Sequence, residues 1–242
     1  MSLSIFLVRH AQSANNAQDE HLRIPDPPIT LLGHKQAQRL ARALAPLGLT
    51  RLYTSPFLRS IETTRDAAST LGLQPFIHRD LFEQGGCYRG HAAGDRHPMP
   101  GMGRTTLQKL CPSWSIDPEI PDKGWNTLDH YEILAEARER AKRVATWIES
   151  TSTGFTRSDS SRSDSSRSVS GQTLASGERW GLIIHADFKL RLLEALLQQD
   201  DLERHLGEVV NTSISRLTRC NGTWKLDFWN SHQHLEPHEV TT

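Results

Sequence analysis

The apolar run Ser4-Ile5-Phe6-Leu7-Val8 is followed at once by Arg9 and His10. An uninterrupted apolar run of this length is typical of a strand that is buried on both faces of a sheet. A strand that ends in an arginine and a histidine places a cation beside a titratable nitrogen at the carboxyl edge of the sheet. Open α/β sheets keep their ligand sites at that edge. The sequence therefore predicts a functional site directly after this strand.

A second apolar run, Trp180-Gly181-Leu182-Ile183-Ile184, also ends in a histidine, His185. Packing of a core does not require two strands that each deliver a histidine. We therefore expect His10 and His185 to meet at one edge of the sheet.

Helices and strands alternate along the rest of the chain. Apolar residues at helical spacing after Thr30, which can cap a helix, predict a helix over 31–47 that Gly48 ends. The other predicted elements are helices over 57–71, 129–149 and 188–199, strands over 51–54 and 74–77, and a hairpin of strands 213–217 and 223–228 that turns at Asn221-Gly222. This alternation predicts an α/β fold, a three-layer α/β/α sandwich with a mostly parallel central sheet.

Composition favours a single domain over residues 1–242. The chain has 28 basic and 28 acidic side chains and a formal net charge of zero, which argues against a nucleic-acid or anionic-membrane surface. Its apolar runs are far shorter than the roughly 18 residues that span a bilayer. Met1-Ser2-Leu3 lacks the features of a signal peptide, and the three cysteines suggest neither a disulfide framework nor a zinc site. We therefore expect a cytoplasmic protein with no membrane or nucleic-acid partner.

Two segments depart from the alternating pattern. Residues 87–128 are rich in proline and glycine, with one short helical patch near 105–110. A loop of this length in a compact domain is usually functional, so we expect a lid or specificity insert, with structural decoration as the alternative. Residues 151–177 consist largely of Ser, Arg, Asp and Gly, a composition that predicts a flexible loop.

The stretch Leu7-Val8-Arg9-His10-Ala11-Gln12-Ser13-x-x-Asn16 resembles the signature of the histidine phosphatase superfamily, also called the phosphoglycerate mutase-like family. The further segments that fall in the family's order are Leu52-Tyr53-Thr54-Ser55-Pro56-x-x-Arg59-x-x-x-Thr63, Leu81-Phe82-Glu83-x-Gly85-Gly86, Ile184-His185-Ala186, Asn211-Thr212-Ser213-Ile214 and Asn230-x-x-x-His234-Leu235. The resemblance spans nearly the whole chain. It departs from the usual pattern at Ala11 and Ala186, where glycine is commonest, and at Gln12, where glutamate is.

The resemblance implies a metal-independent phosphatase that hydrolyses phosphomonoesters through a phosphohistidine on His10, with a phosphoglycerate mutase-like fold and no cofactor. His185 would stabilise charge in the transition state, and Glu83 would protonate the leaving group and then activate water. The residues that would bind the small phosphorylated substrate are Arg9, Asn16, Arg59, His185 and Ala186. These residue types suit the chemistry, because arginine forks bind phosphate oxygens bidentately and a neutral imidazole can attack phosphorus.

Several alternatives stay open. Asp80 and Glu62 compete with Glu83 for the acid role. A phosphoglycerate mutase would use the same site, but residues 84–89 lack the basic, tyrosine-rich segment that mutases of this family carry after the acidic residue. A phospho-ligand-binding pseudo-enzyme is the third candidate, because of the departures from the family pattern.

Other side chains have two possible roles as well. Trp125 and the pair Tyr88-Arg89 either line the substrate pocket or pack the insert. The C-terminal histidines lie in a polar tail, so we predict no metal there; they are His232, His234 and His238.

Overall fold

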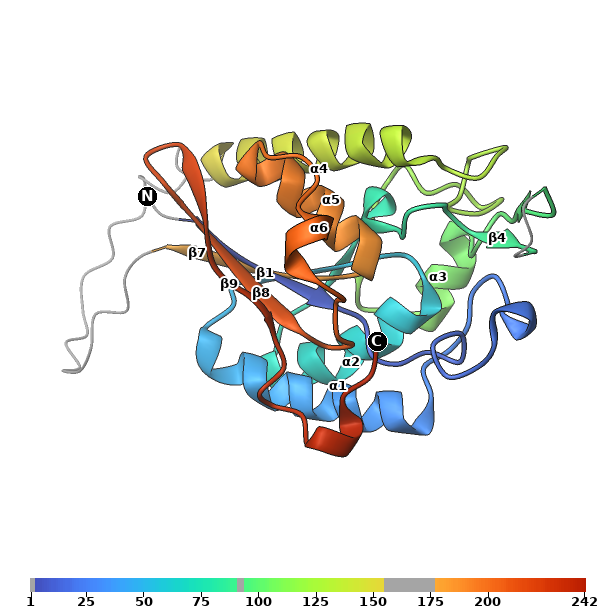
Figure 1. Cartoon of the computed structure of the whole chain (residues 1–242), viewed down its shortest axis with the longest axis horizontal. Coiled ribbons are helices and arrows are strands. Elements are labelled where there is room, and N and C mark those ends of the chain that lie inside the picture. Colours follow the sequence, from blue (N-terminus) through green and yellow to red (C-terminus); the bar gives the residue numbers. More distant parts are fainter. Residues whose placement is uncertain (1–2, 91–93, 155–176) are drawn as a thin grey trace.

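The computed structural model of the chain describes residues 3–90, 94–154 and 177–242. Its central sheet has seven strands in the order β6-β3-β2-β7-β1-β8-β9 (Figure 1). These strands are β1 (Leu3–Arg9), β2 (Arg51–Thr54), β3 (Phe76–Ile77), β6 (Ser115–Ile116), β7 (Glu178–Ile184), β8 (Ile214–Cys220) and β9 (Thr223–Ser231). The five strands from β6 to β1 are parallel, and only β8 and β9 are antiparallel to their neighbours. The mostly parallel sheet expected from the sequence is confirmed.

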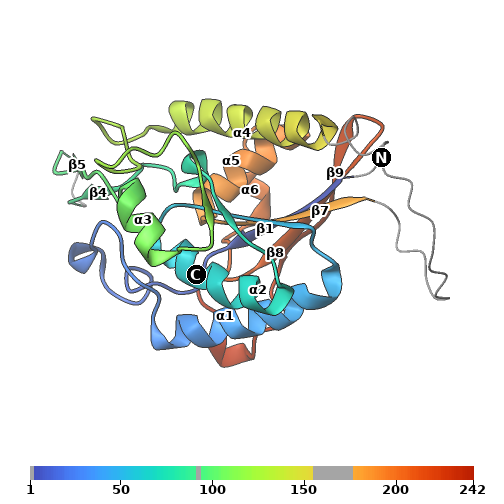
Figure 2. The same ribbon diagram turned by 180° about the vertical axis from the view of Figure 1, so that it is seen from behind.

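Helices cover both faces of this sheet, as Figures 1 and 2 show. The pair α1 and α2 lies on one face, and the pair α4 and α5 lies on the other. The helices are α1 (Leu31–Leu44), α2 (Leu58–Leu71), α3 (Arg104–Leu110), α4 (Leu134–Gly154), α5 (Ala186–Leu197) and α6 (Glu203–Leu206), with short 3₁₀ turns at η1 (Glu20–Leu22), η2 (Ala45–Leu47), η3 (Arg79–Leu81) and η4 (Pro237–Glu239). None of the helices in the described ranges is long and apolar enough to cross a bilayer.

The apolar runs of β1 and β7 explain the three layers. Side chains alternate across a strand, so Ile5 and Leu7 pack with the helix pair α4 and α5, whereas Phe6 and Val8 pack with α1 and α2. A strand that faces a helical layer on both sides has no polar face. The unbroken apolar sequence of β1 is the consequence.

The predicted start of α1 is confirmed, since the Thr30 hydroxyl accepts a hydrogen bond from the N–H of Gly33 at 3.0 Å. The predicted start of α4 near residue 129 is wrong, because the helix begins at Leu134. Glu136 accepts a hydrogen bond from the N–H of Ile133, and Glu132 turns inward to a buried ion pair. This arrangement leaves Ile133, the apolar residue before the helix, 57% exposed.

The hairpin of β8 and β9 turns at the predicted dipeptide. Cys220 pairs with Thr223, and the two residues between them have left-handed backbones, with φ of 53° at Asn221 and 84° at Gly222. Asparagine and glycine are the residues that adopt this conformation most readily. Both strands extend beyond the predicted ends.

Residues 87–128 contain more regular structure than the sequence predicted. Strands β4 (Tyr88–Arg89) and β5 (His97–Pro98) form a small hairpin, α3 follows, and β6 joins the edge of the central sheet through β3. Figure 2 shows α3 and this hairpin at one end of the molecule, away from the tip of the β8–β9 hairpin. The expectation of a loop with only one helical patch is therefore wrong in part, while its role as a lid stays a prediction.

The predicted flexible loop over 151–177 falls almost wholly outside the described residues. Its proposed start is wrong, because α4 continues to Gly154.

Candidate active site

The two histidines that follow the central strands lie side by side at the carboxyl edge of the sheet. β1 and β7 are parallel neighbours, and their register pairs Arg9 with Ile184. The residues after this pair, His10 and His185, have ring centroids 5.0 Å apart. The N–H of His10 also donates to the carbonyl of Ile184 at 2.9 Å. The two strands thus bring together residues that lie far apart in the sequence.

A cavity of about 350 Å³ lies at these strand ends. The predicted site residues that line it are Arg9, His10, Asn16, Arg59, Glu83 and Ala186. His185 does not line the cavity. The wall also includes Arg23, Tyr131 and Asp187, to which the sequence assigned no role. Six of the seven predicted residues therefore share one cavity, and the seventh lies against His10.

The hydrogen bonds of His10 select one tautomer of its ring. Nδ1 lies 2.7 Å from the carbonyl oxygen of Ala11, which can only accept, so Nδ1 carries the hydrogen. Nε2 accepts a hydrogen bond from Nε of Arg59 at 3.2 Å. Burial, and then the charges of Arg59 and Arg9, lower the pKa of His10 well below its ordinary value. The ring is therefore neutral at neutral pH and holds a lone pair on Nε2.

Two arginines line the same cavity, Arg9 buried and Arg59 partly buried. Arg9 ends β1 and donates from Nη1 to the carbonyl of Val209, while its Nε has no partner among the described residues. Arg59 lies on the first turn of α2, and its guanidinium is 3.9 Å from the ring centroid of Phe57. Burial lowers the pKa of Arg9 to about 10 and lowers that of Arg59 as well. Both side chains stay protonated at neutral pH and make the cavity attractive to a dianion.

His185 is fully buried and is held from behind by two serines. Its Nε2 lies 2.7 Å from the Ser55 hydroxyl and 3.4 Å from that of Ser60. Burial, Arg59 and His10 lower its pKa well below the ordinary value. Nδ1 is buried and has no hydrogen-bond partner in the described chain. A hydroxyl that donates to Nε2 leaves the hydrogen on Nδ1, which would then be a donor without an acceptor.

Glu83 lies at the N-terminus of α5. Its Oε1 accepts hydrogen bonds from the N–H groups of Phe188 at 2.9 Å and Gln84 at 2.8 Å. Burial, and then the charge of Asp187, raise the pKa of Glu83 to about 7, although these N–H groups and Arg59 act in the opposite direction. A carboxyl group with this pKa can donate and accept a proton near neutral pH.

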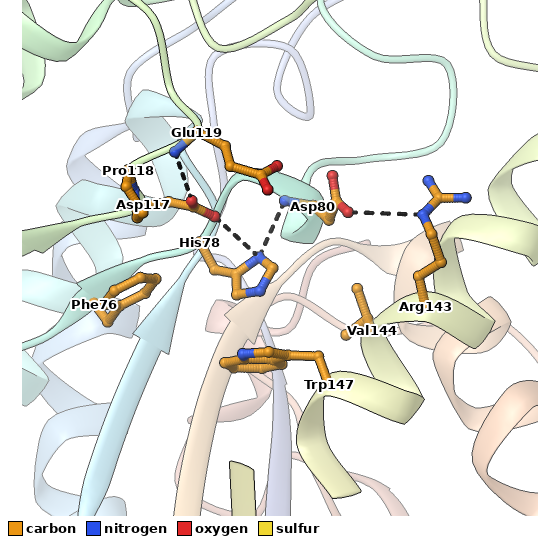
Figure 3. A pocket seen from close by; sticks show the side chains of 9 residues that line it. All are labelled: Phe76, His78, Asp80, Asp117, Pro118, Glu119, Arg143, Val144 and Trp147. Carbon is orange, nitrogen blue, oxygen red and sulfur yellow. Dashed lines mark hydrogen bonds and ion pairs between the residues drawn. The ribbon is translucent and has the colours of Figure 1, made fainter. Parts of the chain in front are cut away.

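The two competing carboxylates point elsewhere. Glu62 accepts a hydrogen bond from the N–H of Ile29 at 2.8 Å. Asp80 lines a separate cavity of about 390 Å³, where it lies 4.0 Å from Arg143 (Figure 3). It also lies 3.6 Å from Arg79. Neither side chain lines the cavity of His10. Their placement favours Glu83 as the acid.

The match to known families agrees with this geometry. A family model described as "Histidine phosphatase superfamily (branch 1)" matches residues 5–156. The chain belongs to this superfamily. The match covers the first histidine, both arginines and Glu83, and ends before His185.

Solved structures show the same fold at low sequence identity. A mycobacterial glucosyl-3-phosphoglycerate phosphatase superposes with a TM-score of 0.62 at 17% identity, covering 96% of this chain and 100% of the other. A phosphoserine phosphatase mutant from Entamoeba histolytica, in complex with phosphoserine, gives a TM-score of 0.60 at 17% identity, with 97% and 100% covered. These likenesses confirm the α/β fold of the superfamily.

Curated relatives match over shorter stretches. A probable phosphoglycerate mutase GpmB from Yersinia enterocolitica is 33% identical over 72 residues, which are 30% of this chain and 34% of the relative. A second GpmB, from an Enterobacter strain, is 33% identical over 81 residues, or 34% and 38% of the two chains. The chain thus spans little more than a third of the length of these relatives.

The departures from the superfamily's usual pattern fit into the site. Ala11 is fully buried, and its N–H donates to the hydroxyl of Thr63 at 2.9 Å. The side chain of Gln12 accepts a hydrogen bond from the hydroxyl of Thr30 at 2.7 Å. Ala186 is the first residue of α5, which begins two residues before the predicted start at 188. Each of the three side chains is accommodated without blocking the cavity.

Asn16 is oriented by the loop that follows β1. Its Oδ1 accepts hydrogen bonds from the N–H and the hydroxyl of Ser13, at 3.1 and 3.0 Å. The amide oxygen is therefore directed to the loop, and the amino group is the end that can donate to an anion in the cavity.

Sequence reasoning assigned no role to several groups around the site. Thr63 binds the N–H of Ala11 in the loop after His10, and Ser55 lies against the ring of His185. Asp187 lines the cavity together with Glu83. Asp26 caps α2 by accepting from the N–H of Leu58, and burial raises its pKa to about 6. Thr63 and Ser55 belong to the motif that contains Arg59, whereas nothing in the sequence places Asp187 or Asp26 near the site.

The two aromatic candidates have different roles. Tyr88 lines the cavity and packs edge-on against Tyr131, with ring centroids 4.9 Å apart. Trp125 is 1% exposed and packs against Phe57 and Phe82, with ring centroids 4.6 and 5.4 Å apart. Tyr88 thus belongs to the pocket wall, and Trp125 belongs to the core.

The described residues contain no group of three histidine, cysteine or acidic side chains that could hold a metal ion. In the C-terminal tail, Nδ1 of His232 lies 2.9 Å from the carbonyl of Asn230, and His234 lies 3.2 Å from the hydroxyl of Thr212. Metal independence and a cytoplasmic location stay predictions.

Proposed function

We propose that the protein is a metal-independent phosphatase that hydrolyses small phosphomonoesters through a phosphohistidine on His10. The observation that carries this proposal is the lone pair on Nε2 of His10, which the Nδ1 hydrogen bond to the Ala11 carbonyl fixes beside Arg59, in a cavity that Arg9 also lines. A neutral imidazole with a fixed lone pair is an effective nucleophile toward phosphorus.

The proposed reaction has two steps. Nε2 of His10 attacks phosphorus while the ester bond breaks, and the proton of Glu83 passes to the leaving alcohol. Glu83, now a carboxylate, takes a proton from water, whose oxygen attacks the phosphohistidine and releases inorganic phosphate. Arg9 and Arg59 neutralise the phosphoryl oxygens in both steps, and His185 packs against the ring of His10, with ring centroids 5.0 Å apart.

Phosphoglycerate mutase activity is the second candidate, supported by the names of the curated relatives. Three observations favour hydrolysis. Beyond Arg9 and Arg59, Arg23 is the one basic side chain among the described residues that line the cavity, and residues 84–89 lack a basic, tyrosine-rich segment. The neighbouring solved structures carry the names of phosphatases. A pseudo-enzyme is disfavoured because both histidines, both arginines and Glu83 meet in one place.

The assay that tests this function uses purified protein, a panel of phosphorylated metabolites and EDTA. We expect release of inorganic phosphate from at least one alkyl phosphate, at a rate that EDTA leaves unchanged, because two arginines already supply the positive charge. With 3-phosphoglycerate we expect phosphate as the main product or no reaction. Rapid interconversion of 2- and 3-phosphoglycerate, primed by 2,3-bisphosphoglycerate, identifies a mutase. Recovery of activity only on adding Mg²⁺ or Zn²⁺ contradicts metal independence.

The pKa shifts predict the pH dependence of kcat/KM for an alkyl phosphate. Glu83 must be protonated for the first step, and its raised pKa of about 7 places the fall of activity on the alkaline side. His10 must be neutral, and its lowered pKa places the acidic limit well below the ordinary value for histidine. We therefore expect kcat/KM to decrease by about tenfold per unit of pH well above 7. A rate that stays constant from pH 6 to 9 contradicts the role of Glu83.

A further inference from the structure

A buried ion pair lies directly behind the proposed acid. Arg140 of α4 is 1% exposed and Glu132 is 3% exposed. Two parallel hydrogen bonds join them, from Nε to Oε1 at 2.7 Å and from Nη2 to Oε2 at 2.6 Å. We propose that this pair positions Glu83 and keeps its carboxyl group able to hold a proton. This inference rests on the proposed function.

The pair anchors the backbone on both sides of Glu83. The remaining terminal nitrogen of Arg140, Nη1, donates to the carbonyls of Asp80 at 2.8 Å and Phe82 at 2.9 Å. The N–H of Glu132 donates to the carbonyl of Gly85 at 3.4 Å. The segment that carries the proposed acid is therefore fastened before and after it to the same two residues.

The guanidinium of Arg140 also packs against Phe188, the residue that donates a hydrogen bond to Glu83. Cζ of Arg140 lies 3.6 Å from the ring centroid of Phe82 and 4.0 Å from that of Phe188. Phe188 is the residue whose N–H donates to Oε1 of Glu83 at 2.9 Å. Arg140 is thus packed between the residue that precedes the acid and the residue that binds its carboxylate, and this arrangement aligns α5 with the Glu83 segment.

The second partner of the pair balances its charge. A lone buried guanidinium near Glu83 would favour the carboxylate form, whereas Glu132 offsets that charge. The other charged groups around Glu83 are Asp187 of α5, which disfavours the carboxylate, and Arg59 and Arg9, which favour it. With the pair intact, the effects of burial and of Asp187 exceed those of the arginines, and the carboxyl group of Glu83 holds its proton more readily.

Lysine cannot replace Arg140 in this role, because an ammonium group lacks the planar fork that serves four acceptors at once. The variant Arg140→Lys keeps the charge and removes this geometry. Breaking a buried pair destabilises a fold, while replacing both partners by apolar side chains is often tolerated. The double variant Arg140→Met with Glu132→Leu therefore tests the same role in a packed protein.

The test compares kcat/KM for an alkyl phosphate from the metabolite panel with kcat/KM for 4-nitrophenyl phosphate. For Arg140→Lys and for the double variant we expect a decrease of about 10- to 100-fold with the alkyl ester, a part of the effect of losing a general acid. We expect less than about threefold with the nitrophenyl ester, whose leaving group needs no proton. For Glu132→Gln we expect the alkaline limb of the pH profile to move to lower pH.

Arg143→Lys is the matched control, because this arginine lies on the same helix and reaches the same segment at Asp80 with a side chain that is 63% exposed (Figure 3). The Arg143→Lys variant should leave kcat/KM unchanged for both esters. Thermal unfolding and circular dichroism identify the folded variants. Equal loss on both esters, or no loss, in a folded double variant overturns the inference while leaving the proposed function intact. Failure of the wild-type protein to hydrolyse any phosphomonoester overturns both.

Discussion

Replacing His10 by alanine is expected to abolish turnover, with a loss of at least about 10⁴-fold in kcat. The side chain removed carries the nitrogen that attacks phosphorus, and no other described histidine lines the cavity. Arg9 and Arg59 stay in place, so a tetrahedral oxyanion such as vanadate should still bind. Steady-state phosphate release and vanadate titration by calorimetry measure the two effects separately.

The covalent intermediate gives an independent readout of the same residue. Brief mixing of the wild-type protein with ³²P-labelled substrate should label the protein through a bond that acid cleaves and base does not. His34→Ala is the matched control, because His34 lies on the exposed side of α1; this variant should be labelled and active. Turnover that survives in His10→Ala, or labelling of that variant, excludes His10 as the nucleophile.

The second large effect is expected from Glu83→Gln. Glutamine keeps the shape and can still accept the hydrogen bond of Phe188, but it cannot supply a proton. We expect kcat for alkyl phosphates to decrease by about 10²–10⁴-fold, whereas 4-nitrophenyl phosphate should lose much less in the first step. A plot of log kcat/KM against the pKa of the leaving alcohol should become steeper in the variant.

Asp80→Asn is the comparison for this experiment. The sequence left Asp80 as an alternative to Glu83 for the acid role, but its side chain lies at the separate cavity of Figure 3. Its replacement should therefore leave the dependence of the rate on the leaving group unchanged. Equal loss on all substrates in Glu83→Gln, together with a steeper plot in Asp80→Asn, would reverse the two assignments.

The sequence predicts the parts of the site that depend on local pattern. The apolar runs of β1 and β7 required burial on two faces, and parallel strands in one sheet bring their carboxyl ends to one edge, so the meeting of His10 and His185 followed. Thr30 acts through its hydroxyl and Asn221-Gly222 through their backbones, and both gave a correct helix start and turn. Gly48 ends the 3₁₀ turn η2 that follows α1, whereas the helix itself ends at Leu44.

The other features of the site depend on contacts between segments that are distant in the sequence, and no local pattern predicts such contacts. Glu132 falls within the predicted helix over 129–149 with no role of its own, and only the fold shows that it meets Arg140 in the interior. Asp187 lies near Glu83 because α5 begins at Ala186 rather than Phe188. The burial of His185 behind His10 likewise depends on Ser55 and Ser60, which α2 and its preceding turn supply.

The pairing of β1 with β7 has a consequence for biosynthesis. β1 ends at Arg9 and β7 begins at Glu178, so β1 leaves the ribosome long before β7 does. Until β7 inserts between β2 and β1, His10 lacks its neighbour His185 and the edge of the sheet at the cavity is incomplete. Closing so long a loop costs conformational entropy before the contacts between β1 and β7 form, so this step of folding is slow. A nascent or truncated chain therefore carries both arginines and Glu83 without any active site, and catalysis reports on complete folding.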